Sequence, residues 1–136
     1  MPLKALTLDD QIGAHREGAA HAMEVPANAR LLFCNGQVGM AHDGGIPDTV
    51  AAQVEIVFER LARILRAASM GFADVVRLTV YVTSEAFIDD YVAARARHLK
   101  DHNPPTILLL VDRFPRAGIK VEIEAVAAKV DERADG

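Results

Sequence analysis

The stretch from Asn103 to Lys129 decides the fold, and it reads NPPTILLLVDRFPRAGIKVEIEAVAAK. In its first half, five apolar residues follow one another without a break at 107–111. An unbroken apolar run of this length is typical of a strand that is covered on both faces. The first half therefore predicts a buried strand.

The second half of this stretch alternates between apolar and charged residues. One face of the predicted strand carries Val121, Ile123 and Ala125, and the other carries Lys120, Glu122 and Glu124. Pro115 and Gly118 lie between the two runs and predict a reversal of the chain. We therefore expect the two runs to form neighbouring antiparallel strands.

Upstream of this stretch, the pattern predicts a hairpin followed by a helix. Strand character at 19–25 and 30–39 is interrupted at Pro26, so these two segments are expected to pair with each other. Apolar residues then recur at spacings of three and four from Val50 to near Gly71, which predicts an amphipathic helix with Asp48 as its N-cap. Residues 6–10 fit either a strand or a short helical turn.

A third strand and a second helix follow in the sequence. Residues 76–82 alternate, and their apolar face is expected to consist of Val76, Leu78, Val80 and Val82. Thr83 and Ser84 are suitable caps for a helix whose buried line is Phe87, Tyr91, Ala94 and either His98 or Leu99.

The predicted fold class is α+β, with a mixed sheet and two helices packed on one of its faces. Two helices cannot cover both faces of such a sheet. The second face would carry Arg77, Thr79, Tyr81 and Glu122 beside aliphatic side chains, and another subunit is its expected cover. The alternative is a sheet face that stays in contact with water.

The composition predicts a single domain, residues 1–136, with a flexible tail at 131–136. Of the 136 residues, 51% are hydrophobic, which suffices for a core without disulfide bonds. The formal net charge of −4 argues against nucleic acid as the main partner. No segment of the sequence predicts a membrane span or a signal peptide. Cys34 is the only cysteine, which fits a reducing compartment, so we expect a cytoplasmic protein.

An ordered set of segments resembles the reactive intermediate deaminase (RidA) family, also called YjgF/YER057c/UK114. The segments, which run from about Ala19 to Lys129, are LLFCNGQVG at 31–39, Gln53, ADVVRLTVYVT at 73–83, Phe87, Pro104 and VEIEAVA at 121–127. The resemblance implies a chorismate-mutase-like subunit and a homotrimer whose sheets form a central barrel. It also implies clefts between subunits where enamines and imines are hydrolysed without a metal or other cofactor.

The resemblance also places candidate site residues on this chain. Glu122 matches the glutamate near the hydrolytic water, and Asn35 and Gly36 match residues whose backbone lines the cleft. The arginine that holds the substrate carboxylate in the family's Pro-x-Arg motif falls on Thr106, so this chain departs from the pattern. A bidentate arginine–carboxylate contact contributes roughly 1.5 to 3 kcal/mol, and a hydroxyl group does not carry the required charge.

Other residues have both a functional and a structural interpretation. His21 is expected either to contact a ligand or to lie on the surface, and Arg77 and Arg113 are either substitutes for the missing cation or charges at the rim. Cys34 is interpreted as a small core residue. The histidines and carboxylates lack the spacing of a metal site, so no structural metal is expected.

Two functions follow as hypotheses. The first is a trimeric hydrolase that binds a small-molecule metabolite, with Glu122 as the catalytic residue and a substrate range altered at Thr106. The second is a trimer of the same fold that binds a small metabolite without turnover. An endoribonuclease activity, a label attached to some family members, has little support from an acidic chain without a basic stripe.

Overall fold

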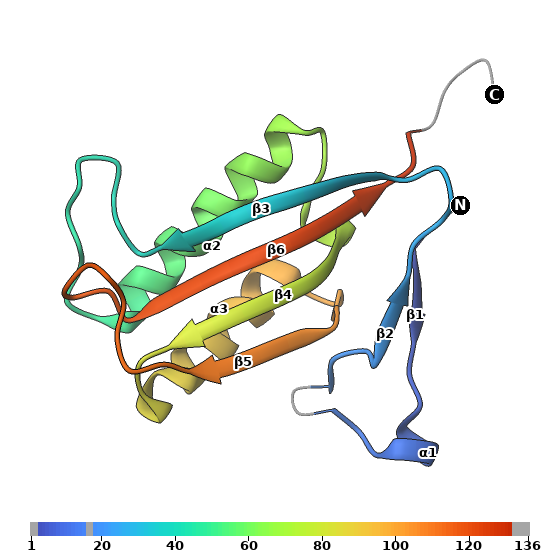
Figure 1. The fold of residues 1–136 in the computed structure, drawn as a ribbon, viewed down its shortest axis with the longest axis horizontal. Helices are drawn as coiled ribbons and strands as arrows, with labels where there is room; N and C mark the ends of the chain where they lie inside the picture. Colours follow the sequence, from blue (N-terminus) through green and yellow to red (C-terminus); the bar gives the residue numbers. More distant parts are fainter. Residues whose placement is uncertain (1–2, 16–17, 132–136) are drawn as a thin grey trace.

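The computed structural model describes residues 3–15 and 18–131 (Figure 1). The predicted order of strands and helices is confirmed, with one further strand at the start. The elements are β1 (Lys4–Leu6), α1 (Asp9–Ile12), β2 (Ala22–Glu24), β3 (Arg30–Val38), α2 (Val50–Ala67), η2 (Phe72–Asp74), β4 (Val75–Val82), η3 (Glu85–Phe87), α3 (Ile88–Leu99), β5 (Thr106–Leu110) and β6 (Val121–Lys129). Residues 6–10, which fitted a strand or a helical turn, contribute to both β1 and α1.

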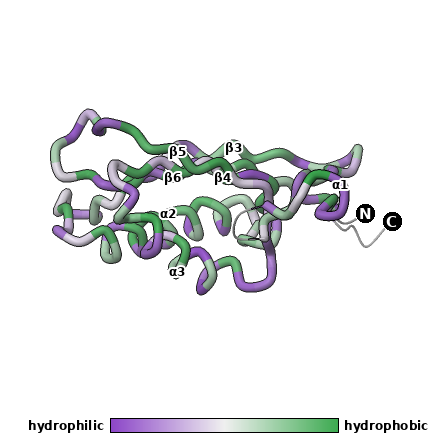
Figure 2. Tube along the Cα trace, turned by 90° about the horizontal axis from the view of Figure 1, so that it is seen from below, coloured by the Kyte–Doolittle hydropathy of each residue, from purple (hydrophilic) through white to green (hydrophobic). Residues whose placement is uncertain are grey.

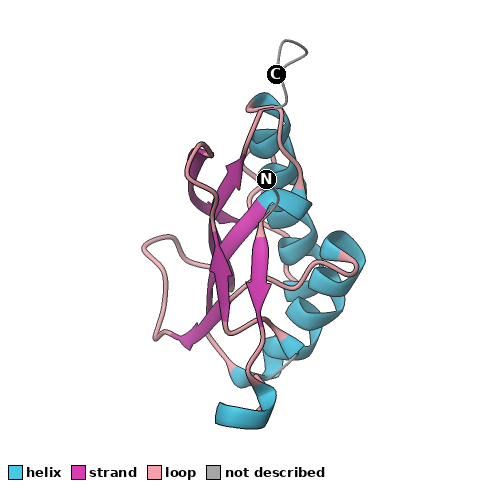
Figure 3. Ribbon diagram, turned by 90° about the vertical axis from the view of Figure 1, so that its right-hand side faces the viewer, coloured by secondary structure: helices cyan, strands magenta, loops and turns pink. Residues whose placement is uncertain are grey.

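The main sheet and the two long helices form two layers. The strands lie in one layer, and α2 and α3 pack together against one of its faces (Figures 2 and 3). Between the layers lies a core of side chains that alternate along the strands and recur on one face of each helix. Within the described ranges, no helix is both long and apolar enough to cross a lipid bilayer.

The order of strands in the main sheet corrects one prediction. The order is β3-β6-β4-β5, so β5 and β6 are not neighbours. Instead, β5 pairs with β4 in parallel, because α3 carries the chain back to the starting end of β4 before β5 begins. The turn near Pro115 and Gly118 then brings β6 to the other edge of β4, where it pairs antiparallel with both β4 and β3.

The predicted hairpin between residues 19–25 and 30–39 is also wrong. Only Ala22–Glu24 is a strand, and it pairs antiparallel with β1 to form a small separate sheet (Figure 1). β3 pairs instead with β6, which offers a partner of nine residues whose apolar face lies on the core. A longer ladder that also buries apolar side chains is favoured over a short hairpin.

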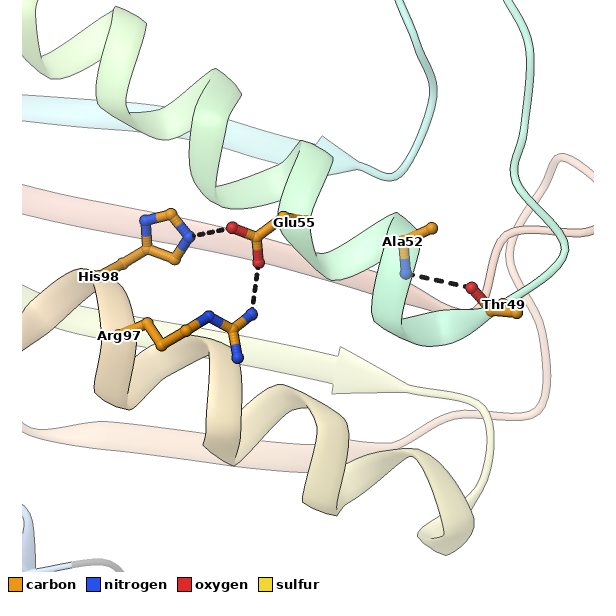
Figure 4. A network of polar contacts seen from close by, with 5 residues as sticks. All are labelled: Thr49, Ala52, Glu55, Arg97 and His98. Carbon is orange, nitrogen blue, oxygen red and sulfur yellow. Dashed lines mark hydrogen bonds and ion pairs between the residues drawn. The ribbon is translucent and has the colours of Figure 1, made fainter.

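Helix α2 closely follows its predicted range. Thr49 rather than Asp48 is its N-cap, and the Thr49 hydroxyl oxygen accepts a hydrogen bond of 3.2 Å from the Ala52 backbone N–H (Figure 4). The helix buries Val50, Gln53, Val54, Val57, Phe58, Leu61 and Leu65. Gln53 is the polar member of this buried face, with no exposed surface at all.

Strand β4 departs from the predicted alternation at its start. The register with β6 shifts between Val75 and Arg77. Because of this irregularity, Val75 is buried while Val76 is only partly buried, and the prediction for Val76 is wrong. From Leu78 onward the predicted alternation is confirmed.

A polar network joins the two long helices (Figure 4). The Glu55 carboxylate on α2 accepts hydrogen bonds of 2.7 Å each from Arg97 Nη2 and His98 Nε2 on α3. The His98 ring stacks on Phe58 with ring centroids 4.9 Å apart. Burial by itself would raise the pKa of Glu55, but the hydrogen bonds and positive charges of Arg97 and His98 outweigh it and lower that pKa.

We expect Glu55→Gln to lower the free energy of unfolding at neutral pH by up to about 1 kcal/mol, because the pair is partly exposed. A carboxylate whose pKa is lowered by folding stabilises the fold above its unfolded pKa, which is about 4.3. This contribution is lost as the pH falls through the folded pKa. Urea unfolding of both proteins at neutral and at acidic pH measures it, with the exposed Glu59→Gln on the same helix as the control. If the difference in unfolding free energy between the unmodified chain and Glu55→Gln does not change with pH, the Glu55 carboxylate does not stabilise the fold through its contacts with Arg97 and His98.

The face of the sheet that points away from the helices is bare in the single chain. It carries apolar side chains that remain largely exposed: Leu31 at 57%, Phe33 at 73%, Ile107 at 39% and Leu109 at 45%. The apolar run of β5 was predicted to be covered on both faces, and the helices cover only one. Asp131, assigned to the flexible tail, accepts a 2.8 Å hydrogen bond from Arg30 Nε, and the rest of that tail lies outside the described residues.

Candidate functional site

The bare face of the sheet brings Glu122 and Gly36 into contact. The register between β3 and β6 shifts between Cys34 and Gln37, so Asn35 and Gly36 form a bulge beside β6. A Cβ atom on Gly36 would overlap the Glu122 carboxylate and would lie 3.0 Å from its Cδ. The absence of a side chain at Gly36 is therefore what lets the carboxylate lie against the bulge.

A second carboxylate and a phenol lie next to Glu122. Glu124 is two residues further along β6 and therefore on the same face, and Tyr81 on β4 pairs in register with Glu122. The Tyr81 hydroxyl donates a hydrogen bond of 2.9 Å to Glu124 Oε1. This hydrogen bond is the largest of the effects that raise the pKa of Tyr81.

The surroundings of Glu122 favour its protonated form. Burial of the carboxyl group raises the pKa of Glu122, and the negative charge of Glu124 raises it further. A carboxylate with a raised pKa binds a proton more readily than an exposed one. Such a group is suited to accept a proton from water during a reaction and to return it afterwards.

We expect Glu124→Gln to lower the pKa of Glu122, because the substitution removes one of its two causes and leaves the burial in place. The measurement is an NMR titration of the Glu122 side-chain carboxyl carbon in both proteins. Glu85→Gln, on the surface at η3, is the control for a general change in charge. A Glu122 pKa that stays the same or rises in Glu124→Gln would show that Glu124 does not act on it.

Thr106 lies apart from Glu122 within one chain. It begins β5 in register with Leu78, on the face of the sheet that the helices cover, and it is 8% exposed. Glu122 is in register with Tyr81, three residues further along β4, so the two residues are separated by about 10 Å along the strands alone. The Thr106 hydroxyl donates a hydrogen bond of 3.0 Å to the Pro104 carbonyl.

The three remaining candidates make no hydrogen bond or ion pair with Glu122 among the residues that the structure describes. Arg77 is exposed on the bare face and pairs in register with Val126, about 13 Å along the strand from the Glu122 position. Arg113 is in an exposed loop, where its Nε lies 3.9 Å from Asp112 Oδ2. His21 lies next to the separate small sheet.

His21 has a structural environment. Its Nδ1 accepts a hydrogen bond of 2.9 Å from the Leu8 backbone N–H, and its Nε2 lies 2.8 Å from the Gly13 carbonyl oxygen. Because Nδ1 accepts, the proton of the neutral ring is on Nε2, which donates to Gly13. Both ring nitrogens therefore hold the segment around α1 against β2.

One feature of the site region was predicted only in part, and another was not predicted. The alternation of β6 placed Glu124 on the same face as Glu122, but Glu124 was not named as a candidate site residue. Arg95 is buried, 5% exposed, and its Nη2 donates to Asn103 Oδ1 at 2.6 Å and to the Pro104 carbonyl at 3.2 Å. Its position four residues after Tyr91 placed it on the buried face of α3. Arg95 thus fixes the turn that leads into Thr106.

Cys34 is buried, as predicted, and burial raises the pKa of its thiol. A thiol with a raised pKa is less nucleophilic at neutral pH. Among residues 3–15 and 18–131, no three histidine, cysteine or acidic side chains lie close enough together to share a metal ion.

Comparison with known proteins identifies the family. A family model described as endoribonuclease L-PSP matches residues 18–129, which is most of the chain. The chain belongs to this family, which is the RidA/YjgF family. The solved structure of a conserved Rid family protein from Yersinia pestis, YyfB, has a TM-score of 0.83 at 27% sequence identity and covers 95% of this chain and 100% of its own. The resemblance found in the sequence and the expected fold class are thereby confirmed.

Curated Rid family relatives are similar over most of their length. The mitochondrial protein mmf2 of Schizosaccharomyces pombe is 30% identical over 104 residues, covering 73% of this chain and 80% of mmf2. A 2-iminobutanoate/2-iminopropanoate deaminase of Escherichia coli is 28% identical over 106 residues, with 73% and 80% covered. Proteins similar to this chain over about three quarters of its length therefore include an imine deaminase.

Proposed function

We propose that this Rid family protein is a homotrimeric hydrolase that converts a small imine or enamine to a carbonyl compound and ammonia in clefts between subunits. One observation carries the proposal: the Glu122 carboxylate, with its raised pKa, lies against the side-chain-free bulge at Gly36 on the bare face of the sheet. The similarity to imine deaminases gives the reaction class.

In the proposed reaction, a water molecule adds to the imine carbon while Glu122 accepts one of its protons. Glu122 passes this proton to the imine nitrogen, which gives a neutral tetrahedral carbinolamine. Glu122 then accepts the proton of the carbinolamine hydroxyl group and delivers it to the nitrogen as the carbon–nitrogen bond breaks. Ammonia leaves, the oxygen becomes the carbonyl oxygen of the product, and Glu122 ends the cycle in its starting state. Asn35 and Gly36 would line the cleft with backbone atoms.

The bare sheet face supports the trimer. Exposed apolar side chains of β3 and β5 flank the polar strip around Glu122, and such a face is typical of a subunit interface. Within one chain, Thr106 lies on the covered face of the sheet, and Arg77 lies about 13 Å along the strands from the Glu122 position. In the proposed trimer, a neighbouring chain brings its own Arg77, or the edge of the sheet where its β5 begins at Thr106, toward Glu122, and substrate binds between them.

The proposed substrate range differs from that of the imine deaminases. At Thr106 the chain lacks the arginine that the family resemblance implies, and the Thr106 hydroxyl already donates to the Pro104 carbonyl. The cleft therefore lacks the fixed positive charge that binds a substrate carboxylate at this position. We expect poor activity on amino-acid-derived imines and better activity on imines without a carboxylate, unless Arg77 supplies the charge.

The same observation on Thr106 favours the second candidate function, a trimer that binds a small metabolite without turnover. Binding a metabolite without turnover requires neither an arginine at position 106 nor a water molecule activated by Glu122. The matching family model is described as an endoribonuclease. The net charge of −4 gives this chain no general attraction for RNA, so we do not propose ribonuclease activity. A cytoplasmic location is proposed from the free, buried thiol of Cys34.

The test generates imines in place from several amino acids with an amino-acid oxidase and measures the release of ketoacid with and without this protein. We expect slow but catalysed release by the unmodified chain. Thr106→Arg should accelerate it about ten- to a hundredfold, the value of one arginine–carboxylate contact. Thr106→Gln is the matched control, since it adds length and hydrogen-bond donors but no charge.

One result would exclude the hydrolase in favour of the binding trimer or another function, and a second would exclude the role proposed for position 106. The first is no acceleration by either the unmodified chain or Thr106→Arg, when both are folded by circular dichroism. The second is equal acceleration by Thr106→Arg and Thr106→Gln, which would show that position 106 does not contact the carboxylate. Sedimentation of the unmodified chain as a single-chain species would exclude the clefts between subunits.

A further inference from the structure

A hollow lies beside β3, on the side of the sheet that the helices cover. It has a volume of about 730 Å³ and is formed by the outer flank of α2 and the segment that follows β3. Its polar lining comes from Gln37, His42, Glu59, Arg60 and Arg63, and its apolar lining from Met40, Ala41, Ile56 and Ile64. We refer to this hollow as the α2 groove.

The α2 groove and the Glu122 carboxylate lie on opposite sides of the sheet. Gln37 lines the groove, and it is in register with Ile123, whose side chain is in the core on the helix side. Glu122 is the next residue along β6, so its side chain points to the bare face. A ligand in the groove would therefore not contact Glu122.

The guanidinium group of Arg60 is held in a fixed position in the groove. Its Nε donates to Gln37 Oε1 at 2.9 Å, and its Nη1 donates to the Met40 carbonyl at 3.0 Å. Gln37 is itself fixed, since its Nε2 donates to the Asn35 carbonyl at 3.0 Å. A guanidinium has five N–H donors. Nη2 of Arg60 has no acceptor among the residues that the structure describes, so part of this fixed fork can bind a ligand.

The charge and the lining of the groove define the ligand class. With histidine counted as neutral, Arg60 and Arg63 contribute two positive charges and Glu59 one negative charge, which leaves one net positive charge. This balance suits a monoanion better than a phosphate dianion. An arginine fork matches the two oxygens of a carboxylate, and the side chains of Met40, Ile56 and Ile64 suit an aliphatic body.

We propose that the α2 groove binds a small aliphatic monocarboxylate through Arg60, at a site separate from the Glu122 cleft. Because Arg60 is already positioned by Gln37 and Met40, little side-chain freedom is lost when the carboxylate binds. This binding site does not depend on whether the protein is a hydrolase.

The test titrates the full chain with hexanoate by calorimetry, with hexanamide as the uncharged probe of the same length. We expect saturable binding of hexanoate and at least about tenfold weaker binding of hexanamide, since one charged hydrogen-bonded contact is lost. Arg60→Gln should weaken hexanoate binding by a similar factor. Arg66→Gln, which makes the same change in charge on the same helix but outside the groove lining, is the matched control and should leave the affinity unchanged.

Two further variants keep the test decisive if Arg60→Gln does not fold. Glu59→Gln removes the negative charge of the groove and should strengthen hexanoate binding. Glu122→Gln should leave hexanoate binding unchanged, because the two sites lie on different sides of the sheet. The proposal is overturned by an absence of saturation, by equal affinity for hexanamide, by equal losses in Arg60→Gln and Arg66→Gln, by weaker binding in Glu59→Gln, or by loss of binding in Glu122→Gln.

Discussion

Replacing Gln53 by leucine is expected to lower the free energy of unfolding by about 3 kcal/mol or more. The Gln53 amide is completely buried and joins three backbone groups of two loops. Its Nε2 donates to the carbonyls of Pro47 at 2.9 Å and Gly118 at 2.8 Å, and its Oε1 accepts from the Lys120 backbone N–H at 2.8 Å. Leucine has a similar size but leaves all three groups without this partner, and each such loss costs about 1 to 3 kcal/mol when the group is buried.

Urea unfolding at equal chain concentration measures this effect, since association of subunits would otherwise change the apparent stability. Gln11→Leu is the matched control, because Gln11 is exposed on α1 and the chemical change is the same. A loss below about 1 kcal/mol in Gln53→Leu would mean that water replaces the amide at these backbone groups.

The second large effect is expected for Glu122→Gln, which should slow the proposed imine hydrolysis by about 10² to 10⁴, the usual contribution of a general base. The same substitution should stabilise the fold at neutral pH. The pKa of Glu122 is raised by folding, so the ionised group favours the unfolded chain once the pH exceeds the unfolded pKa of about 4.3. Glutamine has the same shape without this charge.

Ketoacid release and thermal unfolding at neutral and acidic pH measure the two effects on the same samples. The gain in stability should disappear at a pH below the unfolded pKa, where Glu122 is protonated in both states. Glu24→Gln, on the exposed strand β2, is the control for the loss of one negative charge. Glu122→Gln with unchanged turnover would remove this residue from the mechanism, and a loss of stability at neutral pH would contradict its assigned environment.

Periodicity predicted the elements of this fold well and their pairing poorly. The ranges of α2 and of most of β4 followed from apolar spacing, because each buries one face and nothing else is needed to define that face. An alternating strand looks the same whichever neighbour it pairs with. The positions of β5 and β6 depend on the path of the chain through α3, and the pattern of either strand contains no information about that path.

In the candidate site, too, the face on which a residue lies was predicted, and the contacts between segments were not. Alternation alone placed Glu122 and Glu124 together on the face opposite to Ile123. The contact between Glu122 and Gly36 depends on one extra residue in β3, which shifts the register. The contact between Arg60 and Gln37 joins two segments that are far apart in the sequence, so neither segment predicted it.

The side-chain amide of Gln37 links the α2 groove to the bulge in β3. Its Oε1 accepts a hydrogen bond from Arg60 in the groove, and its Nε2 donates one to the Asn35 carbonyl in the bulge beside Glu122. Substitutions at Arg60 and in the bulge at Asn35 and Gly36 are therefore expected not to be energetically additive, whereas Glu122 makes no hydrogen bond to Gln37 among the residues that the structure describes. During divergence of the family, or in directed evolution, a change in the α2 groove is expected to alter which changes the bulge tolerates.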